Sequence, residues 1–197
     1  MTPLVIPGLP VDEELHSRVL QSPLARARGG IMLHYDDSSR DDWSVAWFRD
    51  PRCANGYTWL VLRSGRVVEL ADPAARTPHA GWCRTPDANS FFYGVSAATD
   101  GVHEASPAQL DALIEVCVAL CLFHRWPADC ITGHDVEAIW TKAGTRAAGI
   151  PDARAQALWG KTGRKVDPTG VRADGVPIIH LREVRAGVEA RMAGGLP

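Results

Sequence analysis

The sequence lacks the features that mark several common protein classes. It contains no run of about 18 consecutive apolar residues, so we expect no membrane span. Its 21 Lys and Arg residues do not exceed its 23 Asp and Glu residues, and the formal net charge is -2. This balance argues against a nucleic-acid partner, which requires a basic surface. The chain has no internal repeat and no low-complexity segment. We therefore expect a single globular domain over residues 1–197, and a monomer.

Cysteines are few, and their arrangement does not suggest disulfides. There are five, an odd number, and none forms a C-x-x-C pair. Cys117 and Cys121 lie four positions apart in a strongly apolar run, which is typical of the buried face of a helix. The first 15 residues lack the basic start and apolar stretch of a secretory signal. We expect a protein that is made in the cytoplasm.

Local patterns predict an α/β fold with a central mixed sheet flanked by helices. Ser106, Pro107 and Gln109 fit the N-cap, first-turn and capping-box positions of a helix that ends near Trp126. Trp43 and Trp47 should lie on one face of a helix at 41–50. Strands are predicted at 29–35, 91–99 and 130–134, a hairpin at 57–70 around Ser64–Gly65, and further helices at 12–21, 41–50, 151–160 and 178–193.

Two of the seven histidines follow apolar, strand-like runs. His34 and His134 each stand at the carboxyl end of such a run, where a rigid scaffold can hold a ligand near solvent. They are 100 positions apart, and this spacing alone favours a structural role over a metal site. The other histidines have no partner at ligand spacing, except that His79 belongs to a motif described below.

A third polar feature lies in residues 163–170, with the sequence GRKVDPTG. Pro168 restricts Asp167 to extended conformations, so Lys165 and Asp167 would point to the same side of an extended segment. In isolation, an ordinary surface turn is the favoured interpretation, because Asp-Pro-Thr-Gly is typical of turns.

Taken in order, six segments resemble the zinc N-acetylmuramoyl-L-alanine amidase family, which includes phage lysozyme-type amidases and the peptidoglycan recognition proteins. The matching segments are IMLHY (31–35), NGYTWLVLRSGRVVEL (55–70), HAG (79–81), ANSFFYGVS (88–96), ITGHD (131–135) and GRKVDPTG (163–170). Each segment alone is weakly specific, but their order and spacing agree over about residues 29–170. An N-terminal arm (1–28) and a C-terminal helix (about 178–193) would flank this core.

The resemblance implies that one Zn²⁺ is bound by His34, His134 and Asp167. Three protein ligands leave an open position, which is typical of a catalytic zinc site. The implied reaction is hydrolysis of the amide bond between N-acetylmuramic acid and L-alanine in peptidoglycan. Lys165 would stabilise the oxyanion, and Tyr57 would hydrogen-bond the attacking water or the tetrahedral intermediate.

The resemblance also implies a substrate-binding group. His79 belongs to a groove motif of the family and is not a metal ligand there, so we give it a binding or loop-shaping role. Trp82 would pack against a sugar or peptide, although a core position fits it equally well. Asn89 precedes the central strand, where it would hold a loop in place.

The sequence departs from the family in two ways. Ser96 stands where many members have a catalytic Glu, and a serine cannot act as a general base at neutral pH. The base is then Tyr57, a chain of waters, or an acid such as Asp36 or Asp135. In addition, 32 residues separate His134 from Asp167, more than is usual. We hypothesise that the extra segment, about 136–160, walls or caps the substrate groove.

Three biological roles agree with these features. The first is a phage or prophage endolysin, which would reach the cell wall after holin-type release. The second is a cytosolic amidase that recycles soluble muropeptides. The third is a receptor that binds peptidoglycan without cleaving it. Since such receptors typically lose a metal ligand, the presence of all three predicted ligands favours an enzyme.

Overall fold

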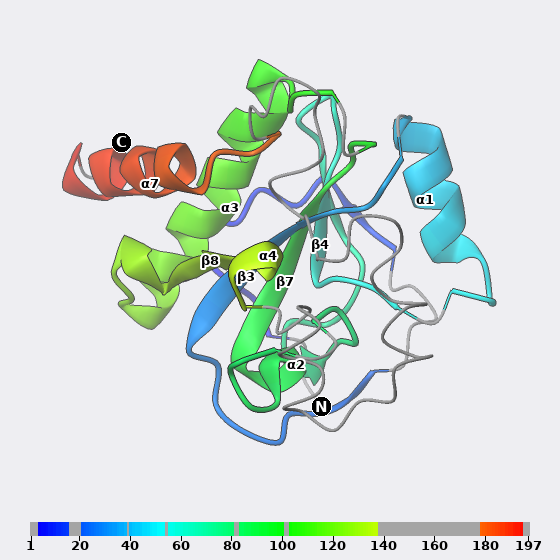
Figure 1. The fold of residues 1–197 in the computed structure, drawn as a ribbon, viewed down its shortest axis with the longest axis horizontal. Coiled ribbons are helices and arrows are strands. Elements are labelled where there is room, and N and C mark those ends of the chain that lie inside the picture. Colours follow the sequence, from blue (N-terminus) through cyan, green and yellow to red (C-terminus); the bar gives the residue numbers. More distant parts are fainter. Residues whose placement is uncertain are drawn as a thin grey trace.

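The computed structural model describes residues 4–15, 21–38, 40–53, 55–80, 83–100, 103–137 and 178–194. Its main feature is a six-stranded mixed sheet, as the sequence predicts (Figure 1). In spatial order the strands are β1 (Glu13–Glu14), β5 (Val67–Glu69), β4 (Trp59–Val61), β7 (Phe92–Ala97), β3 (Gly30–Tyr35) and β8 (Ile131–Gly133). A separate antiparallel pair is formed by β2 (Ser22–Pro23) and β6 (Ala75–Arg76).

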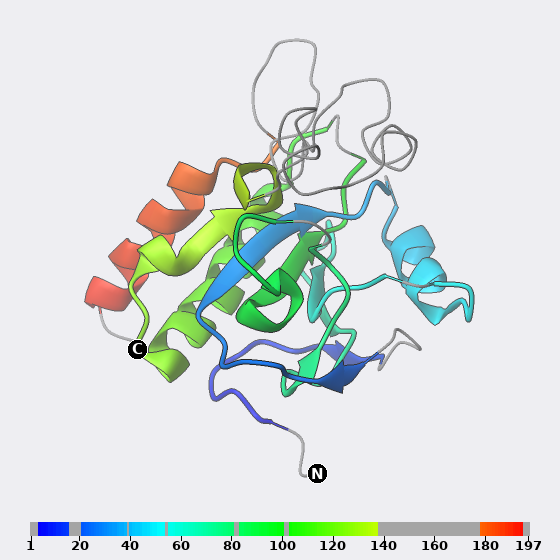
Figure 2. The ribbon, with the colours of Figure 1, turned by 60° about the horizontal axis from the view of Figure 1, so that its bottom comes forward.

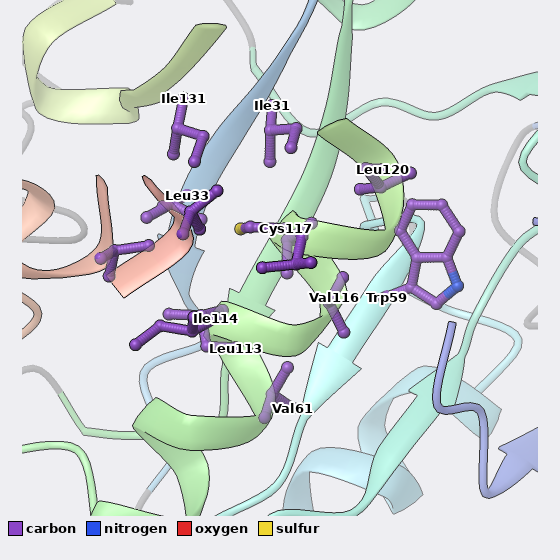
Figure 3. Packing of buried hydrophobic residues seen from close by; sticks show 14 of the residues in the cluster. Ile31, Leu33, Trp59, Val61, Leu113, Ile114, Val116, Cys117, Leu120 and Ile131 are labelled. Carbon is purple, nitrogen blue, oxygen red and sulfur yellow. The ribbon is translucent and has the colours of Figure 1, made fainter. Parts of the chain in front are cut away.

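Strands β4, β7, β3 and β8 run parallel to one another, so their carboxyl ends lie at one edge of the sheet. Their side chains alternate between the two faces. Ile31, Leu33 and Val61 point to the face covered by helix α3 (Pro107–His124), where they pack with Leu113 and other buried residues (Figure 3). The opposite face carries Met32, His34, Leu60 and Ser96.

Two long helices cover the first face. Helix α7 (Leu181–Gly194) packs beside α3, as Figures 1 and 2 show, and buries Val184 and Val188. It starts three residues later than predicted. The length and apolar composition of α3 would also suit a membrane span, but half of this segment is buried within the fold. Cys117 and Cys121 are fully buried on α3, as expected, and no disulfide joins any of the five cysteines in the structure.

The start of α3 is as predicted, with one correction. Ser106 is the N-cap, and its hydroxyl accepts a hydrogen bond from the Gln109 backbone N–H at 3.0 Å. The Gln109 side chain does not complete a capping box. It is buried, and its Nε2 donates to the carbonyl oxygens of Val61 (2.8 Å) and Ala98 (3.1 Å). Gln109 therefore joins the helix to two strand ends, and the Val61 carbonyl accepts from the Ala98 backbone N–H as well.

The opposite face is covered by smaller elements. Helix α1 (Asp41–Arg49) buries Phe48 against the residues around Leu60, while Trp43 and Trp47 share its exposed side. The short helix α2 (Ala88–Phe91) lies against this face of the sheet (Figure 2). Its Ala88 is buried in one cluster with Met32. The hairpin of β4 and β5 turns at Ser64–Gly65 as predicted, with Gly65 at φ 88°, a conformation that glycine adopts readily.

Other predictions differ from the structure or fall outside it. The helix predicted at 12–21 is wrong at its start, because Glu13–Glu14 form β1, which pairs in parallel with β5. β8 follows a short 3₁₀ turn, η1 (Ala128–Cys130), and His134 begins a one-turn helix, α4 (His134–Glu137), where a loop was expected. The predicted helix at 151–160, and the extra segment from residue 138 onward, lie outside the described residues.

Candidate active site

The two histidines that end apolar runs in the sequence meet at the carboxyl edge of the sheet. Leu33 and Gly133 are register partners in β3 and β8, so the residues that follow them are neighbours. The Nδ1 atoms of His34 and His134 lie 3.1 Å apart, and their ring centroids are 4.7 Å apart. Both rings are buried, with exposures of 1% and 3%. Sheet topology therefore brings together a pair that sequence spacing did not connect.

The hydrogen bonds on the far side of each ring assign its proton. His134 Nε2 lies 2.7 Å from the carbonyl oxygen of Ala80, and His79 Nε2 lies 3.1 Å from that of Phe92. A carbonyl only accepts, so both Nε2 atoms carry the hydrogen. Burial, more than the neighbouring His34, Arg28 and His134, holds the pKa of His79 well below its ordinary value, so this ring is neutral.

The proton on His34 follows from its contact with His79. In a neutral ring whose Nε2 is protonated, Nδ1 accepts, and His79 Nδ1 lies 3.0 Å from His34 Nε2. His34 therefore donates through Nε2, and its Nδ1 carries a lone pair. The same is true of His134. The two Nδ1 atoms then face each other across 3.1 Å, an arrangement that suits two nitrogens that bind one cation.

The third predicted ligand, Asp167, lies outside the described residues. The predicted catalytic residue Lys165 and the predicted groove residue Trp82 also lie outside them. Within the part of the chain that the structure describes, no three His, Cys, Asp or Glu side chains are placed to hold a metal ion. His79 does not supply the missing ligand, because it contacts the Nε2 side of His34, away from the paired Nδ1 atoms.

The segment His79–Ala80 lies directly behind the histidine pair. The Asn89 side-chain oxygen accepts from the backbone N–H groups of His79 (2.9 Å) and Ala80 (2.7 Å). Asn89 thus holds this loop in place, and His79 is 93% buried behind His34, with only 7% exposed. A substrate-binding role for these two residues stays a prediction.

Tyr57 also contacts the ring of His34. Its ring is half-buried and tilted, with a centroid 4.9 Å from that of His34, and it also contacts Phe48 of α1. The hydroxyl donates to the Tyr35 carbonyl oxygen at 3.3 Å. The structure therefore places the predicted catalytic Tyr beside one of the two predicted metal-binding histidines.

The site also contains residues that bear on the identity of the base. Ser96 is the register partner of His34 on β7 and is fully buried, and its Oγ has no hydrogen-bond partner among the described residues. Asp36 follows β3, and its Oδ1 accepts from the backbone N–H groups of Ser38 and Thr99. Burial raises the pKa of Asp36 to about 6 despite these bonds.

Sequence reasoning missed Gly94, which makes room for His79. A Cβ added at Gly94 would lie 2.7 Å from His79 Cγ and 3.0 Å from its Nδ1, closer than real Cβ atoms come. A signal was present, because an isolated glycine within a strand often marks a close approach by another group. The role of the Ala80 carbonyl had no sequence signal, since every residue has one.

Comparison with known proteins agrees with this architecture. The N-acetylmuramoyl-L-alanine amidase family model matches residues 25–169, close to the predicted core of about 29–170. A search of curated proteins finds no match. A crystal structure of a selenomethionine AmpD derivative is similar, with a TM-score of 0.58 and 20% identity over 88% of this chain and 94% of that one.

Two further solved structures share the fold. The catalytic domain of XlyA has a TM-score of 0.51 and 11% identity, over 76% of this chain and 100% of that one. A mutant endolysin from Bacillus subtilis has a TM-score of 0.51 and 12% identity, over 76% and 99%. The family match covers most of the sequence and includes both histidines of the buried pair. The chain therefore belongs to the N-acetylmuramoyl-L-alanine amidase family.

Proposed function

We propose that this protein is a zinc-dependent enzyme that hydrolyses the amide bond between N-acetylmuramic acid and the L-alanine of the peptidoglycan stem peptide. The observation that carries the proposal is the pair of Nδ1 atoms of His34 and His134, which lie 3.1 Å apart at the edge of an amidase-family sheet. Two nitrogens that share a tetrahedral zinc ion, each about 2.0–2.1 Å from it, are separated by roughly 3.3 Å. The pair fits that requirement.

His34, His134 and, from the resemblance, Asp167 would hold the ion. Zinc bound there would supply a Lewis acid that polarises the scissile carbonyl and lowers the pKa of the attacking water. Two neutral imidazoles and one carboxylate leave a net positive charge, which this chemistry requires. The buried Nε2–H bonds of both histidines keep their rings oriented while substrate binds.

The remaining steps fall to other side chains. Amide hydrolysis needs a donor for the developing oxyanion and a proton for the departing nitrogen. Tyr57 is close enough to His34 for its hydroxyl to turn from the Tyr35 carbonyl toward the reacting carbonyl. Lys165 would stabilise the oxyanion as a point charge. Ser96 has no role in proton transfer, because a serine hydroxyl does not accept a proton at neutral pH.

The test is mass analysis of products from two substrates, purified cell wall and soluble muropeptides, with and without zinc. New L-alanine amino termini that appear only with zinc would support the proposal. Cleavage of intact wall would favour the endolysin that the sequence predicts. Cleavage of soluble fragments alone would favour a recycling amidase. Binding without cleavage of either substrate would overturn the proposal in favour of a receptor. His134→Ala is the control, since it should abolish zinc-dependent cleavage.

A further inference from the structure

We propose that the two-residue segment His79–Ala80 is a shared positioning element, which holds the proton of both metal-site histidines on Nε2, so that Nδ1 is the ring nitrogen that binds a metal ion. The inference rests on the proposed zinc dependence. It assigns to His79 a role behind the metal site, whereas the sequence resemblance implied a role in the substrate groove. His79 acts through His34 and is a positioning residue, because it touches neither Nδ1 atom.

The side chain of His79 serves one histidine. Starting from the Phe92 carbonyl, two hydrogen bonds run through the ring of His79 to Nε2 of His34, with lengths of 3.1 and 3.0 Å. The Phe92 carbonyl can only accept, so Nε2 of His79 donates to it. Nδ1 of the neutral His79 ring then accepts from Nε2 of His34. If His34 carried its hydrogen on Nδ1 instead, it would lose this bond and block its own metal-binding atom.

The backbone of the next residue serves the other histidine. The Ala80 carbonyl accepts from His134 Nε2 at 2.7 Å, which leaves Nδ1 of His134 unprotonated in the neutral ring. The two bonds come from neighbouring residues, so their separation is fixed by covalent geometry. A shift of this segment would therefore disturb both histidines together, although these are 100 positions apart in sequence and belong to different elements.

Two residues outside the metal site keep the segment in place. Asn89 accepts from the backbone N–H groups of both His79 and Ala80, and its own carbonyl accepts from Arg28. Gly94 on β7 leaves the space that the His79 ring occupies, since a Cβ would come within 2.7 Å of Cγ. Asn89 thus holds the backbone of the segment, and the His79 ring packs against the backbone of β7 at Gly94.

The consequence is measurable as metal affinity. Hydrogen-bond partners behind metal-binding histidines typically change metal affinity by about 10–100-fold when they are removed. We expect an effect of this size from His79→Phe, which keeps a ring but removes the acceptor. Asn89→Leu should give a similar loss, because it releases the segment that carries both acceptors. Asn89→Asp is the matched control, because its carboxylate still accepts both backbone N–H groups.

The experiment measures the affinity of the full-length variants for Zn²⁺ by competition with a chromogenic chelator, with circular dichroism to show that each is folded. A 10–100-fold weaker affinity for His79→Phe and Asn89→Leu, with Asn89→Asp close to the original protein, is the expected result. Folded variants that bind Zn²⁺ as tightly as the original protein would overturn the inference alone. Absence of Zn²⁺ binding by the original protein would overturn the proposed function, and this inference with it.

A second measurement does not depend on how the variants fold. Nitrogen-15 NMR of the histidine rings of the zinc-loaded protein reports which nitrogen carries the hydrogen and which binds the ion. His34 and His134 should carry the hydrogen on Nε2 and bind zinc through Nδ1, and His79 should be an Nε2–H tautomer. An Nδ1–H tautomer on His34 or His134 in the folded protein would contradict the proposal.

Discussion

Replacing Ser96 by alanine should stabilise the protein and leave its catalytic rate unchanged. Ser96 is fully buried next to His34, and its Oγ has no hydrogen-bond partner among the described residues. A buried polar group without a partner costs about 1–3 kcal/mol of desolvation. The loss of one oxygen atom leaves only a small gap, which offsets part of the gain.

We therefore expect Ser96→Ala to raise the free energy of unfolding by about 1 kcal/mol, which corresponds to a rise in Tm of about 2–4 °C for a chain of this size. Denaturant and thermal unfolding of the metal-free protein would measure the change. Ser90→Ala is the matched control. Ser90 is equally buried, but its Oγ accepts from the Ala25 backbone N–H at 3.2 Å, so this change should destabilise the fold.

The same variant tests the chemistry. Ser96 occupies the position at which many family members have a catalytic Glu, and we assign it no part in proton transfer. kcat/KM for cell-wall cleavage should then stay within a factor of two of the original value, on the order of 0.4 kcal/mol in transition-state stabilisation. A tenfold fall in kcat/KM with unchanged or increased stability would refute this reasoning, because it would mean that the hydroxyl contributes to the reaction.

Three further predictions concern the site and the fold. Asp167→Ala should lose zinc, measured by metal analysis, together with activity, whereas Lys165→Ala should keep zinc and lose rate; metal loss in the Lys165 variant would contradict its assignment to the oxyanion. Tyr57→Phe should lower kcat by about 10–1000-fold with unchanged zinc content, because it removes one donor to the transition state; an unchanged kcat would exclude that role. Ser106→Ala should lower the free energy of unfolding by about 1 kcal/mol through loss of the N-cap of α3, and chemical denaturation that showed no change would contradict the cap's contribution.

The elements that could be predicted from the sequence are those whose structure depends mainly on their own residues and not on distant contacts. The apolar runs ending at His34 and Gly133 form strands, and Ser64–Gly65 turns the hairpin through the positive φ that glycine allows. The helix capped by Ser106 starts where its capping residues indicate. In these segments local propensity and tertiary burial favour the same structure.

The errors occur where distant contacts decide. Glu13–Glu14 belong to an acidic segment with helical character, yet they form a strand because the backbone pairs with β5, more than fifty positions away. The Gln109 side chain had a local partner available but bonds instead to the carbonyls of two strand ends, which the folded sheet brings next to the start of α3. Such outcomes depend on the assembled sheet, and the residues themselves carry no signal of it.

The candidate site shows the same division. The types of residue at 34 and 134 and their places at strand ends could be read from the sequence, but their 3.1 Å contact follows from the parallel pairing of β3 and β8. The place of His79 could not be predicted, because it depends on the path of a loop across Gly94. Resemblance to a family supplied the predicted ligand set, and the structure added the hydrogen bonds at Nε2 of two of the predicted ligands, His34 and His134.

The parallel pairing of β3 with β8 also has a consequence for folding kinetics. It joins residues 31–33 to 131–133, so a loop of about one hundred residues must close before the two strands can meet. Contacts of such long range form slowly, because the entropy of loop closure is lost before the contacts are gained. The proposed metal site can then form only after β8 has joined the sheet. A chain that has emerged from the ribosome up to η1 can form the hairpin and α3, but it does not yet include His134, which the proposed site requires.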